Sequence, residues 1–306
     1  MTDNAIDNSY AFLPNRSILS VSGPDARQFL QGLISNDMRK VSPERAIWAA
    51  LLTPQGKFLH DFFITERAVD GAFLLEVETH RREDLTKRLK LYRLRAKVDL
   101  GNESPHLVVA AIFGDPLTWP RLTETGAATA FGAGTIYRDP RLSAAGLRLV
   151  APAQDVAALG DKGYREVSAD GYDQWRLGLG LPDGSRDLVL EKATLMESGF
   201  DELHGIDWSK GCYIGQELTA RMKYRGLVKK RLVPITTSGT IPEPGTLILK
   251  DGSDVGEIRS SRGKTGLALI KIDAFPTTSS APLLSLDQEI TAHVPSWIKL
   301  PEAKPT

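Results

Sequence analysis

The spacing of apolar and polar residues in the first half of the chain predicts short strands interleaved with single helices. Residues 1–16 indicate a polar lead-in, and residues 17–21 predict a strand that a helix follows. Two apolar runs at 46–52 and 58–65, separated by a glycine-containing turn, predict a β-hairpin. A longer helix is expected over 79–97. This order of elements indicates an α+β fold rather than a doubly wound parallel sheet.

The hydrophobic pattern changes in the second half of the chain. After residue 226, short apolar runs replace the helical spacing. Turns rich in glycine and proline separate these runs. The runs are 232–235, 246–249, 255–258 and 267–272. Several short strands at such spacing are typical of a small antiparallel barrel or sandwich, so we expect an all-β region at this end of the chain.

Length, composition and charge narrow the classes of protein to which the chain can belong. Its 306 residues are enough for two or three packed units, at roughly 100–200 residues per domain. The 38 basic and 38 acidic side chains cancel, which argues against a general grip on nucleic acid or on an anionic membrane. The sequence has no apolar run of about 18 residues and no signal-type segment, so a cytoplasmic location is the default expectation.

The chain contains one cysteine, Cys212. A single thiol excludes an internal disulfide and a zinc site built on paired cysteines. It also excludes an iron–sulfur cluster held by this chain alone, because such clusters normally take about four thiolates. We therefore expect no resident metal. Cys212 can still offer one ligand to a cluster shared transiently with a partner, or undergo reversible oxidation.

The cysteine lies in the densest group of chemically able side chains, KGCYIGQE at residues 210–217. Apolar residues recur every four positions from Ile214 to Met222, which predicts a helix and puts Cys212 at or just before its N-terminus. Unpaired N–H groups there, together with the charge of Lys210, favour a thiolate, so both residues are candidates for reactivity. The alternative for Cys212 is an inert, buried small side chain, which is the usual role of a lone cysteine.

The helix expected at 79–97 has a strongly basic face. Its cationic side chains are opposed only by Glu83 and Asp84. The cationic residues are Arg81, Arg82, Lys87, Arg88, Lys90, Arg93, Arg95 and Lys97. Such a face can hold a phosphate, a polyglutamate tail or an acidic partner, and it can equally be a solvated surface.

The cysteine motif also resembles that of a known family. Residues 210–217, extended by LTAR at 218–221 and KKRL at 229–232, resemble the YgfZ-type folate-binding proteins. These proteins are relatives of the aminomethyltransferase, or T protein, of the glycine cleavage system, and they include a mitochondrial iron–sulfur assembly factor. Further matches are FLQGLISND at 29–37, TPQGK at 53–57, VGEI at 255–258 and GLA at 266–268. Besides Lys210 and Cys212, the motif residues are Gly211, Tyr213, Gly215, Gln216, Glu217 and Arg221.

The resemblance implies a ring-like arrangement of three subdomains, with tetrahydrofolate in the central channel and the cysteine loop at its mouth. Residues 1–228 would form the aminomethyltransferase-like region of two interleaved α+β subdomains, 229–300 a C-terminal β-barrel and 301–306 a tail. A role in assembling or repairing [4Fe–4S] clusters on client enzymes is implied too, including radical enzymes that modify tRNA. The expected partners are iron–sulfur assembly or client proteins and a folate, without direct contact to nucleic acid or membranes.

A pterin ring needs aromatic or aliphatic walls and a carboxylate or amide for its polar edge. The candidates that supply these side-chain types are Asn36, Asp37, Asp61, Tyr172, Trp175 and Glu197. Asp61 is flanked by apolar residues, so it either faces outward on an alternating strand or is placed in a pocket. The default role of Trp175 is core packing. Lys210 and Arg221 are candidates for stabilising the thiolate or for contacting a partner.

One position helps to discriminate between two functions. The T proteins carry two adjacent acids in the hairpin, one of them catalytic, whereas this chain has His60 followed by Asp61. The cysteine motif, which the T proteins lack, favours an accessory factor for iron–sulfur proteins. The alternative is a tetrahydrofolate-dependent aminomethyltransferase in which Asp61 tunes proton transfer, so whether the chain is an enzyme stays open. An RNA-binding role for the basic face is a third hypothesis, which the neutral net charge disfavours.

Overall fold

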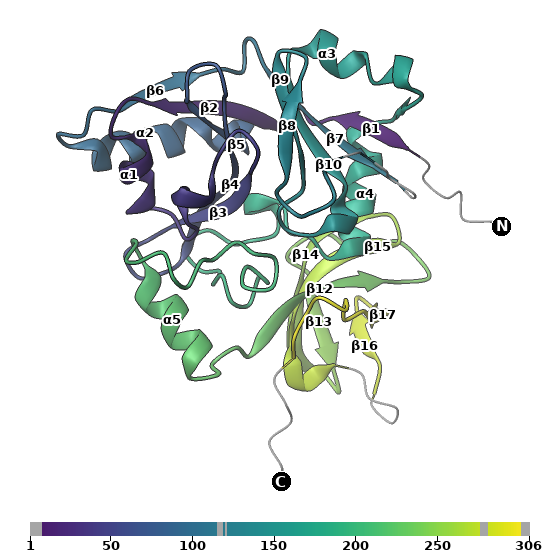
Figure 1. The fold of residues 1–306 in the computed structure, drawn as a ribbon. Helices are drawn as coiled ribbons and strands as arrows, with labels where there is room; N and C mark the ends of the chain where they lie inside the picture. Colours follow the sequence, from purple (N-terminus) through teal and green to yellow (C-terminus); the bar gives the residue numbers. More distant parts are fainter. Residues whose placement is uncertain (1–7, 115–118, 120, 276–280, 301–306) are drawn as a thin grey trace. The chain divides into compact units, whose positions relative to one another are not determined.

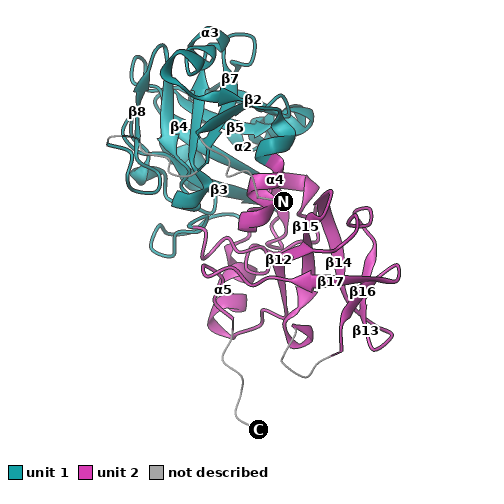
Figure 2. Cartoon of the chain, turned by 90° about the vertical axis from the view of Figure 1, so that its right-hand side faces the viewer, with its two compact units in different colours: residues 1–52, 60–172, 204–214 teal, residues 53–59, 173–203, 215–306 magenta. Residues whose placement is uncertain are grey.

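The chain passes repeatedly between two folded units, which Figure 2 shows in different colours. The computed structural model describes residues 8–114, 119, 121–275 and 281–300. Unit 1 comprises residues 1–52, 60–172 and 204–214. Unit 2 comprises residues 53–59, 173–203 and 215–306. Both units are therefore assembled from segments that lie far apart in the sequence.

A five-stranded sheet with helices on one face forms the first half of unit 1 (Figure 1). Its strand order is β3 (Ile47–Leu52), β4 (Phe58–Glu66), β5 (Phe73–Glu78), β2 (Arg16–Ser22) and β6 (Asp99–Asn102). The helices α1 (Ala26–Gln31) and α2 (Arg82–Arg93) bury Leu30, Leu85 and Leu89 in one core with the sheet. The hairpin predicted at 46–65 is confirmed, whereas the helix expected over 79–97 ends earlier, at Arg93.

A six-stranded sheet forms the other half of unit 1. Its strand order is β11 (Arg165–Glu166), β1 (Ser9–Phe12), β7 (Val108–Phe113), β10 (Leu147–Ala151), β9 (Gly134–Arg138) and β8 (Ala128–Phe131). The short helix α3 (Ala153–Ala157) adds Val156 to the core on one of its faces. The segment expected as a polar lead-in thus contains a strand, β1, which pairs with both β7 and β11.

Buried charges occupy the interior of unit 1. The carboxylate of Glu76 on β5 accepts hydrogen bonds from Arg16 Nε, Arg148 Nε and Tyr137 Oη, each at 2.9 Å. Arg148 also donates to the Tyr172 hydroxyl at 2.8 Å. Burial by itself raises the pKa of Glu76, but the two guanidinium groups outweigh it, so this pKa lies below its ordinary value. Glu76 is therefore a charged carboxylate in the interior, compensated on both sides.

Unit 2 contains most of helix α4 (Ala169–Leu179), helix α5 (Gln216–Tyr224) and a closed barrel. The barrel order is β12 (Lys230–Thr236), β15 (Thr265–Lys271), β14 (Ser253–Arg262), β13 (Leu247–Lys250), β16 (Leu283–Ser285) and β17 (Gln288–Ala292). Val233, Ile258 and Ile270 are fully buried in its core. The predicted all-β region is confirmed as a barrel, which β17 closes by pairing with β12. The boundary expected at 228 stays a prediction, and the expected tail at 301–306 lies outside the described residues.

None of the helices in the described part of the chain is both long enough and apolar enough to cross a bilayer.

Candidate functional site

The cysteine loop presents its thiol at the surface. Cys212 is exposed, so it is not the inert core residue that was the alternative expectation. Helix α5 begins at Gln216, with Gly215 as its N-cap, so Cys212 precedes the first helical residue by four positions. Gly211 has a φ of +94°, and an added Cβ would meet nothing within 4 Å. This glycine is needed for its backbone conformation rather than for space.

Lys210 fixes the loop to the end of helix α1. Its ammonium group donates to the carbonyl oxygens of Gln31 at 2.5 Å and Ile34 at 2.8 Å, and the residue is only 6% exposed. Carbonyl groups at the C-terminal end of a helix lack intrahelical partners and attract a cation. The ammonium also lies 4.9 Å from the centre of the Tyr213 ring. Lys210 therefore ties the cysteine loop to the end of α1 and contacts Tyr213, the residue after the cysteine.

Gln31 links the cysteine motif to the N-terminal motif. Its side-chain amide donates to the Lys210 carbonyl and to the Asp37 carboxylate, each at 3.1 Å. Its amide oxygen accepts from the backbone N–H of Met38 at 2.7 Å. Every polar atom of this side chain is thus used to hold the segment after α1 against residue 210.

Three further contacts join the segments 31–40 and 205–214. The Ser35 hydroxyl donates to the Gly205 carbonyl at 2.6 Å, and the Asp207 N–H donates to the Ser35 carbonyl at 3.0 Å. Lys40 pairs with the Asp207 carboxylate at 2.5 Å. The two motifs that resembled the same family are therefore parts of one structure, in which the first holds the second.

The electrostatics of Lys210 follow from its buried position. Burial lowers its pKa to about 8, although the carboxylates of Asp37 and Asp207 and the thiol group of Cys212 act in the opposite direction. At pH 7 the amine is therefore mostly protonated. Its charge interacts with Cys212 at the surface while its hydrogens are bonded to helix-end carbonyls.

Replacing Lys210 with methionine is expected to loosen the cysteine loop. Methionine keeps the apolar stem but loses two hydrogen bonds from a charged group, each worth about 1.5–3 kcal/mol. Amide hydrogen exchange across residues 205–214 should accelerate about tenfold or more, since about 1.4 kcal/mol corresponds to a factor of ten. Lys223→Met is the matched control, because Lys223 pairs with Asp201 at the surface. Unchanged protection in Lys210→Met would show that the ammonium does not hold the loop.

Asn36 and Asp37 are committed to the backbone of the same region. The Asn36 amide donates to the carbonyls of Trp48 at 2.7 Å and His204 at 2.8 Å. Asp37 receives two N–H groups of the Arg39 side chain, and this hydrogen bonding lowers the pKa of Asp37 to about 2. Asn36 and Asp37, two of the candidates for binding a pterin, therefore already form hydrogen bonds with other residues of this chain.

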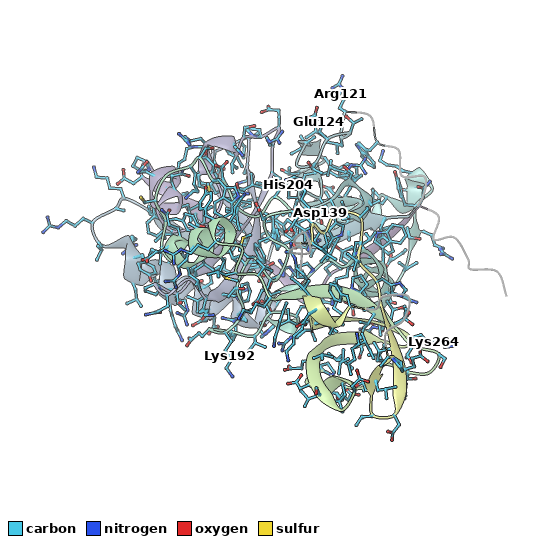
Figure 3. All side chains as sticks on the ribbon, turned by 90° about the horizontal axis from the view of Figure 1, so that it is seen from below. Arg121, Glu124, Asp139, Lys192, His204 and Lys264 are labelled. Atoms are coloured by element: carbon cyan, nitrogen blue, oxygen red, sulfur yellow. The ribbon has the colours of Figure 1, made fainter. Side chains whose placement is uncertain are left out.

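A cavity of about 210 Å³ lies beside Asn36 within unit 1. Lys40, Arg45 and His204 line it too, so cationic and hydrogen-bonding groups outnumber acids in its wall. His204, labelled in Figure 3, has a φ of +58°, a conformation that non-glycine residues seldom adopt. This cavity is suited to a carboxylate or another small anionic group.

Asp61 lies inside unit 1 rather than on its surface. The Trp48 indole N–H donates to the Asp61 carboxylate at 3.0 Å, and the Trp48 ring stacks near Phe63 at 6.4 Å. His60, the next residue on β4, instead contacts Asp84 at 2.8 Å. Burial, together with the nearby charge of Arg81, lowers the pKa of His60 to about 4. Successive strand residues point to opposite faces, so the histidine does not share the surroundings of Asp61.

Tyr172 belongs to the buried network of unit 1. Its hydroxyl accepts from Arg148, and its ring packs edge-on against Phe113 at 5.4 Å. Because Arg148 is held in turn by Glu76, the tyrosine is positioned by a charge in the core rather than by the cysteine loop.

The remaining candidates lie in unit 2. Glu197 accepts from the Thr194 hydroxyl at 2.9 Å and lines a cavity of about 380 Å³, together with Lys230. Lys192 also lines this cavity, and its side chain extends away from the ribbon in Figure 3. Trp175 is half-buried on α4. Gln216, Glu217 and Arg221 lie on α5, where Glu217 and Arg221 are exposed.

The structure therefore brings together only some of the predicted residues. Lys210, Cys212, Asn36 and Asp37 meet around the end of α1 in unit 1. Of the residues that hold them, Gln31 and Ser35 belong to the matched stretch 29–37, whereas Lys40, Trp48 and Asp207 were not predicted from the sequence. Among the residues that the structure describes, no group of three or more histidine, cysteine or acidic side chains could hold a metal ion. The cysteine loop presents one exposed thiol group.

Comparisons with known families agree with the two-part architecture. Residues 16–116 match the GCVT N-terminal domain, and residues 229–300 match the C-terminal β-barrel domain of CAF17. The crystal structure of the glycine cleavage system aminomethyltransferase T from Bartonella henselae superposes with a TM-score of 0.77 at 15% identity, over 96% of this chain and 87% of that one. At that identity the likeness shows the fold, so the expected aminomethyltransferase-type fold with a C-terminal barrel is confirmed.

Curated relatives cover nearly the whole chain. The mitochondrial iron–sulfur cluster assembly factor IBA57 is 36% identical in Homo sapiens and 34% identical in Mus musculus, over 93% of this chain and 84% of each relative. The homologue from Pyricularia oryzae is 32% identical, over 95% of this chain and 85% of the relative. These relatives are named as mitochondrial proteins, which contradicts the cytoplasmic location expected from the sequence. By its identity to these proteins along almost its full length, this chain belongs to the IBA57 family of iron–sulfur cluster assembly factors.

Proposed function

We propose that this protein takes part in assembling or repairing [4Fe–4S] clusters, with the thiolate of Cys212 as a transient ligand. The observation that carries the proposal is the exposed thiol of Cys212 on a loop that the buried ammonium of Lys210 fixes in place. The names of the relatives, iron–sulfur cluster assembly factors, support the same role. Clients on the YgfZ-like branch of this fold would include radical enzymes that modify tRNA.

The cluster is cargo in this proposal, and a partner supplies its other ligands. Cys212 is the only cysteine in the chain, so about three further thiolates of a four-thiolate set must come from outside. A thiolate rather than a thiol binds iron, and Lys210, whose ammonium is bonded to helix-end carbonyls, holds the loop that carries Cys212. The exposed position lets a partner approach without opening the fold. Loss of [4Fe–4S] enzyme activity in cells that carry Cys212→Ser tests this role.

Tetrahydrofolate is the cofactor that we propose for the interior. The cationic cavity beside Asn36 in unit 1 fits the carboxylate end of a folate, and the carboxylate of Asp61, in the same unit, fits the donor-rich edge of a pterin. When bound, tetrahydrofolate offers nitrogen atoms for one-carbon chemistry. The residues of this chain would orient it: Asp61, held by Trp48, has a fixed carboxylate direction.

Calorimetry with tetrahydrofolate should show binding that Asp61→Asn weakens about tenfold, because the substitution removes a charged acceptor while keeping the shape of the side chain. His60→Asn is the matched control, since the neighbouring strand residue faces Asp84 and should leave the affinity unchanged. Thermal melts of both variants check that each is folded. Absence of heat with the wild-type protein would remove the folate proposal altogether.

Aminomethyl transfer is the second candidate, and the buried carboxylate of Asp61 on a GcvT-like fold favours it. The histidine at position 60, where the T proteins have a second acid, is only weak evidence against aminomethyl transfer. Its side chain points away from Asp61 and pairs with Asp84. The direct test combines the purified protein with the partners of the glycine cleavage system. Turnover of the aminomethyl group would make this the primary function, and its absence would leave the accessory role.

A further inference from the structure

Half of the cations on the basic helix have partners within the protein. Arg81 and Arg88 both pair with Asp84, at 3.2 Å and 2.9 Å. Arg82 donates to the Ser104 hydroxyl, and Arg93 donates to the Val98 carbonyl, each at 3.3 Å. These four arginines therefore stabilise the fold of unit 1, and they explain only part of the charge that the sequence concentrates here.

The other four cations and two leucines of the segment 87–97 are all exposed. In the described part of the chain, the side chains of Lys87, Lys90, Arg95 and Lys97 make no hydrogen bond or ion pair, and all four are exposed. Leu91 is 74% exposed and Leu94 is 87% exposed. Lys87, Lys90 and Leu91 lie on one face of α2, because residues three and four apart are neighbours on a helix. We call these six residues the basic leucine patch.

Leu94 is exposed, and its backbone has a positive φ, a conformation that is sterically strained for leucine. It is the C-cap of α2, with φ +45° and ψ −108°, where a glycine would sit without steric strain. Its side chain contributes no burial in this chain. Residues held in such conformations are concentrated at binding sites, where contact with a ligand or partner gives the side chain its use.

We propose that the basic leucine patch docks an acidic segment of a partner protein, one that carries carboxylates on either side of an apolar residue. The four free cations match the carboxylates, and Leu91 and Leu94 offer the apolar contact. Nearby acids of this chain include Glu83, Asp84 and Asp25. Asp84 already pairs with Arg81 and Arg88, and Asp25 already accepts the backbone N–H of Lys97. The proposal rests on the proposed function only in that the partner would be an iron–sulfur assembly or client protein.

A protein partner fits this surface better than a membrane. Helices that lie in a membrane interface bury a broad apolar face. The apolar face of α2 is already used, because Leu85 and Leu89 are fully buried in the core of unit 1. Only two leucines remain for an outside contact, which suits a short acidic segment.

The first step of the test identifies the segment that touches the patch. A photo-cross-linking amino acid replaces Leu91 in the full chain, and the same substitution at Leu286 is the control. Leu286 is also an exposed leucine, at 72%, with φ +46°, but it lies in the barrel and outside the patch. We expect an adduct at position 91, absent at 286, on a segment with aspartate or glutamate beside an apolar residue. No adduct, or an adduct on a segment without acids, would overturn the proposal.

The second step uses a synthetic peptide of the cross-linked segment. Lys87→Glu with Lys90→Glu should weaken its binding about tenfold or more, because like charges then face each other. A peptide with lysines in place of its acids should bind this double variant and not the wild type. Equal binding of the peptide to both proteins contradicts the proposal. So does sedimentation of the wild-type protein, but not of the double variant, with phosphatidylserine vesicles, because it would assign the patch to a membrane.

The third step separates binding from folding. Leu94→Gly should weaken peptide binding while its thermal midpoint stays equal to that of the wild type or rises, since strain is removed and no buried contact is lost. Leu286→Gly should behave alike in the melt but bind the peptide normally. Cys212→Ser should also bind it normally, so loss of the cluster function and loss of the patch are distinguishable. A Leu94→Gly variant with wild-type binding would remove the leucine from the proposal.

Discussion

Cys212→Ser is expected to abolish the contribution of this protein to [4Fe–4S] enzyme activity while leaving its fold intact. A serine hydroxyl is not ionised at neutral pH and is a poor ligand for iron, so the exchange of sulfur for oxygen removes the one ligand that the chain can offer. Because Cys212 is exposed, the stability change should stay within about 0.5 kcal/mol. The measurement is the activity of a [4Fe–4S] enzyme in cells whose own copy is replaced by the variant.

Two controls make this result specific to the thiol. Cys212→Ala should give the same loss, because neither side chain can become a thiolate. Tyr224→Ala, at a position 74% exposed on α5, should retain full activity, since it alters an exposed side chain outside residues 210–217. Thermal melts of all three variants should coincide with the wild type. Normal enzyme activity with Cys212→Ser would exclude the thiolate role.

The second large effect is expected in the core of unit 1. Glu76→Gln should lower the free energy of unfolding by about 3–5 kcal/mol, because it leaves the guanidinium groups of Arg16 and Arg148 buried without their carboxylate. Chemical denaturation followed by tryptophan fluorescence measures the change. Asp70→Asn is the matched control: its carboxylate pairs with Arg67 at the surface, where a pair contributes about 0–1 kcal/mol.

The same carboxylate gives stability a defined pH dependence. The pKa of Glu76 is lower in the folded state than in the unfolded chain, so the stabilisation is present above the unfolded value. It is lost as the pH falls through the depressed folded value, where the carboxylate takes up a proton. The Glu76→Gln variant should show a flatter acid branch than the wild type. A loss of stability below about 1 kcal/mol, or parallel acid branches, would contradict the buried charge pair.

Local patterns were enough to predict much of the fold. The hairpin of β3 and β4 and four of the barrel strands follow from apolar runs bounded by turn residues. Strand β1 was missed because its four residues follow directly on a polar stretch and give no clear apolar run. Its strand character comes from pairing with β7 and β11, which are distant in sequence. The last strands of the barrel, β16 with three residues and β17 with five, were also missed.

The sequence was enough to identify several residues of the site, but not the contacts between them. The motif at 210–217 identified Cys212 and Lys210, and their residue types suggested a reactive thiol beside a cation. The partner of Lys210 could not be found this way, because Gln31 is 179 positions away. Lys40 and Asp207 carry no local signal at all, and only the fold puts their charges together at 2.5 Å.

The pair at 60 and 61 shows how a motif comparison can mislead about chemistry. A histidine in place of an acid suggested a depleted catalytic site around Asp61. On the strand the two side chains diverge, His60 toward Asp84 and Asp61 toward the indole of Trp48. The substitution therefore changed one surface of β4 and left the environment of Asp61 as it was.

The contacts that hold the cysteine loop also determine the stage of synthesis and folding at which this loop can become ordered. Gln31 and Lys210 meet only after the ribosome has completed some 179 intervening positions, and Ser35 and Gly205 are separated by 170. Closing so long a loop is entropically unfavourable until the strands between have paired, so this is a late event in folding. A truncated or stalled chain that ends before residue 205 cannot order the segment after α1 in this way. Synthesis itself therefore delays presentation of the thiol until the last segment of unit 1, residues 204–214, has been made.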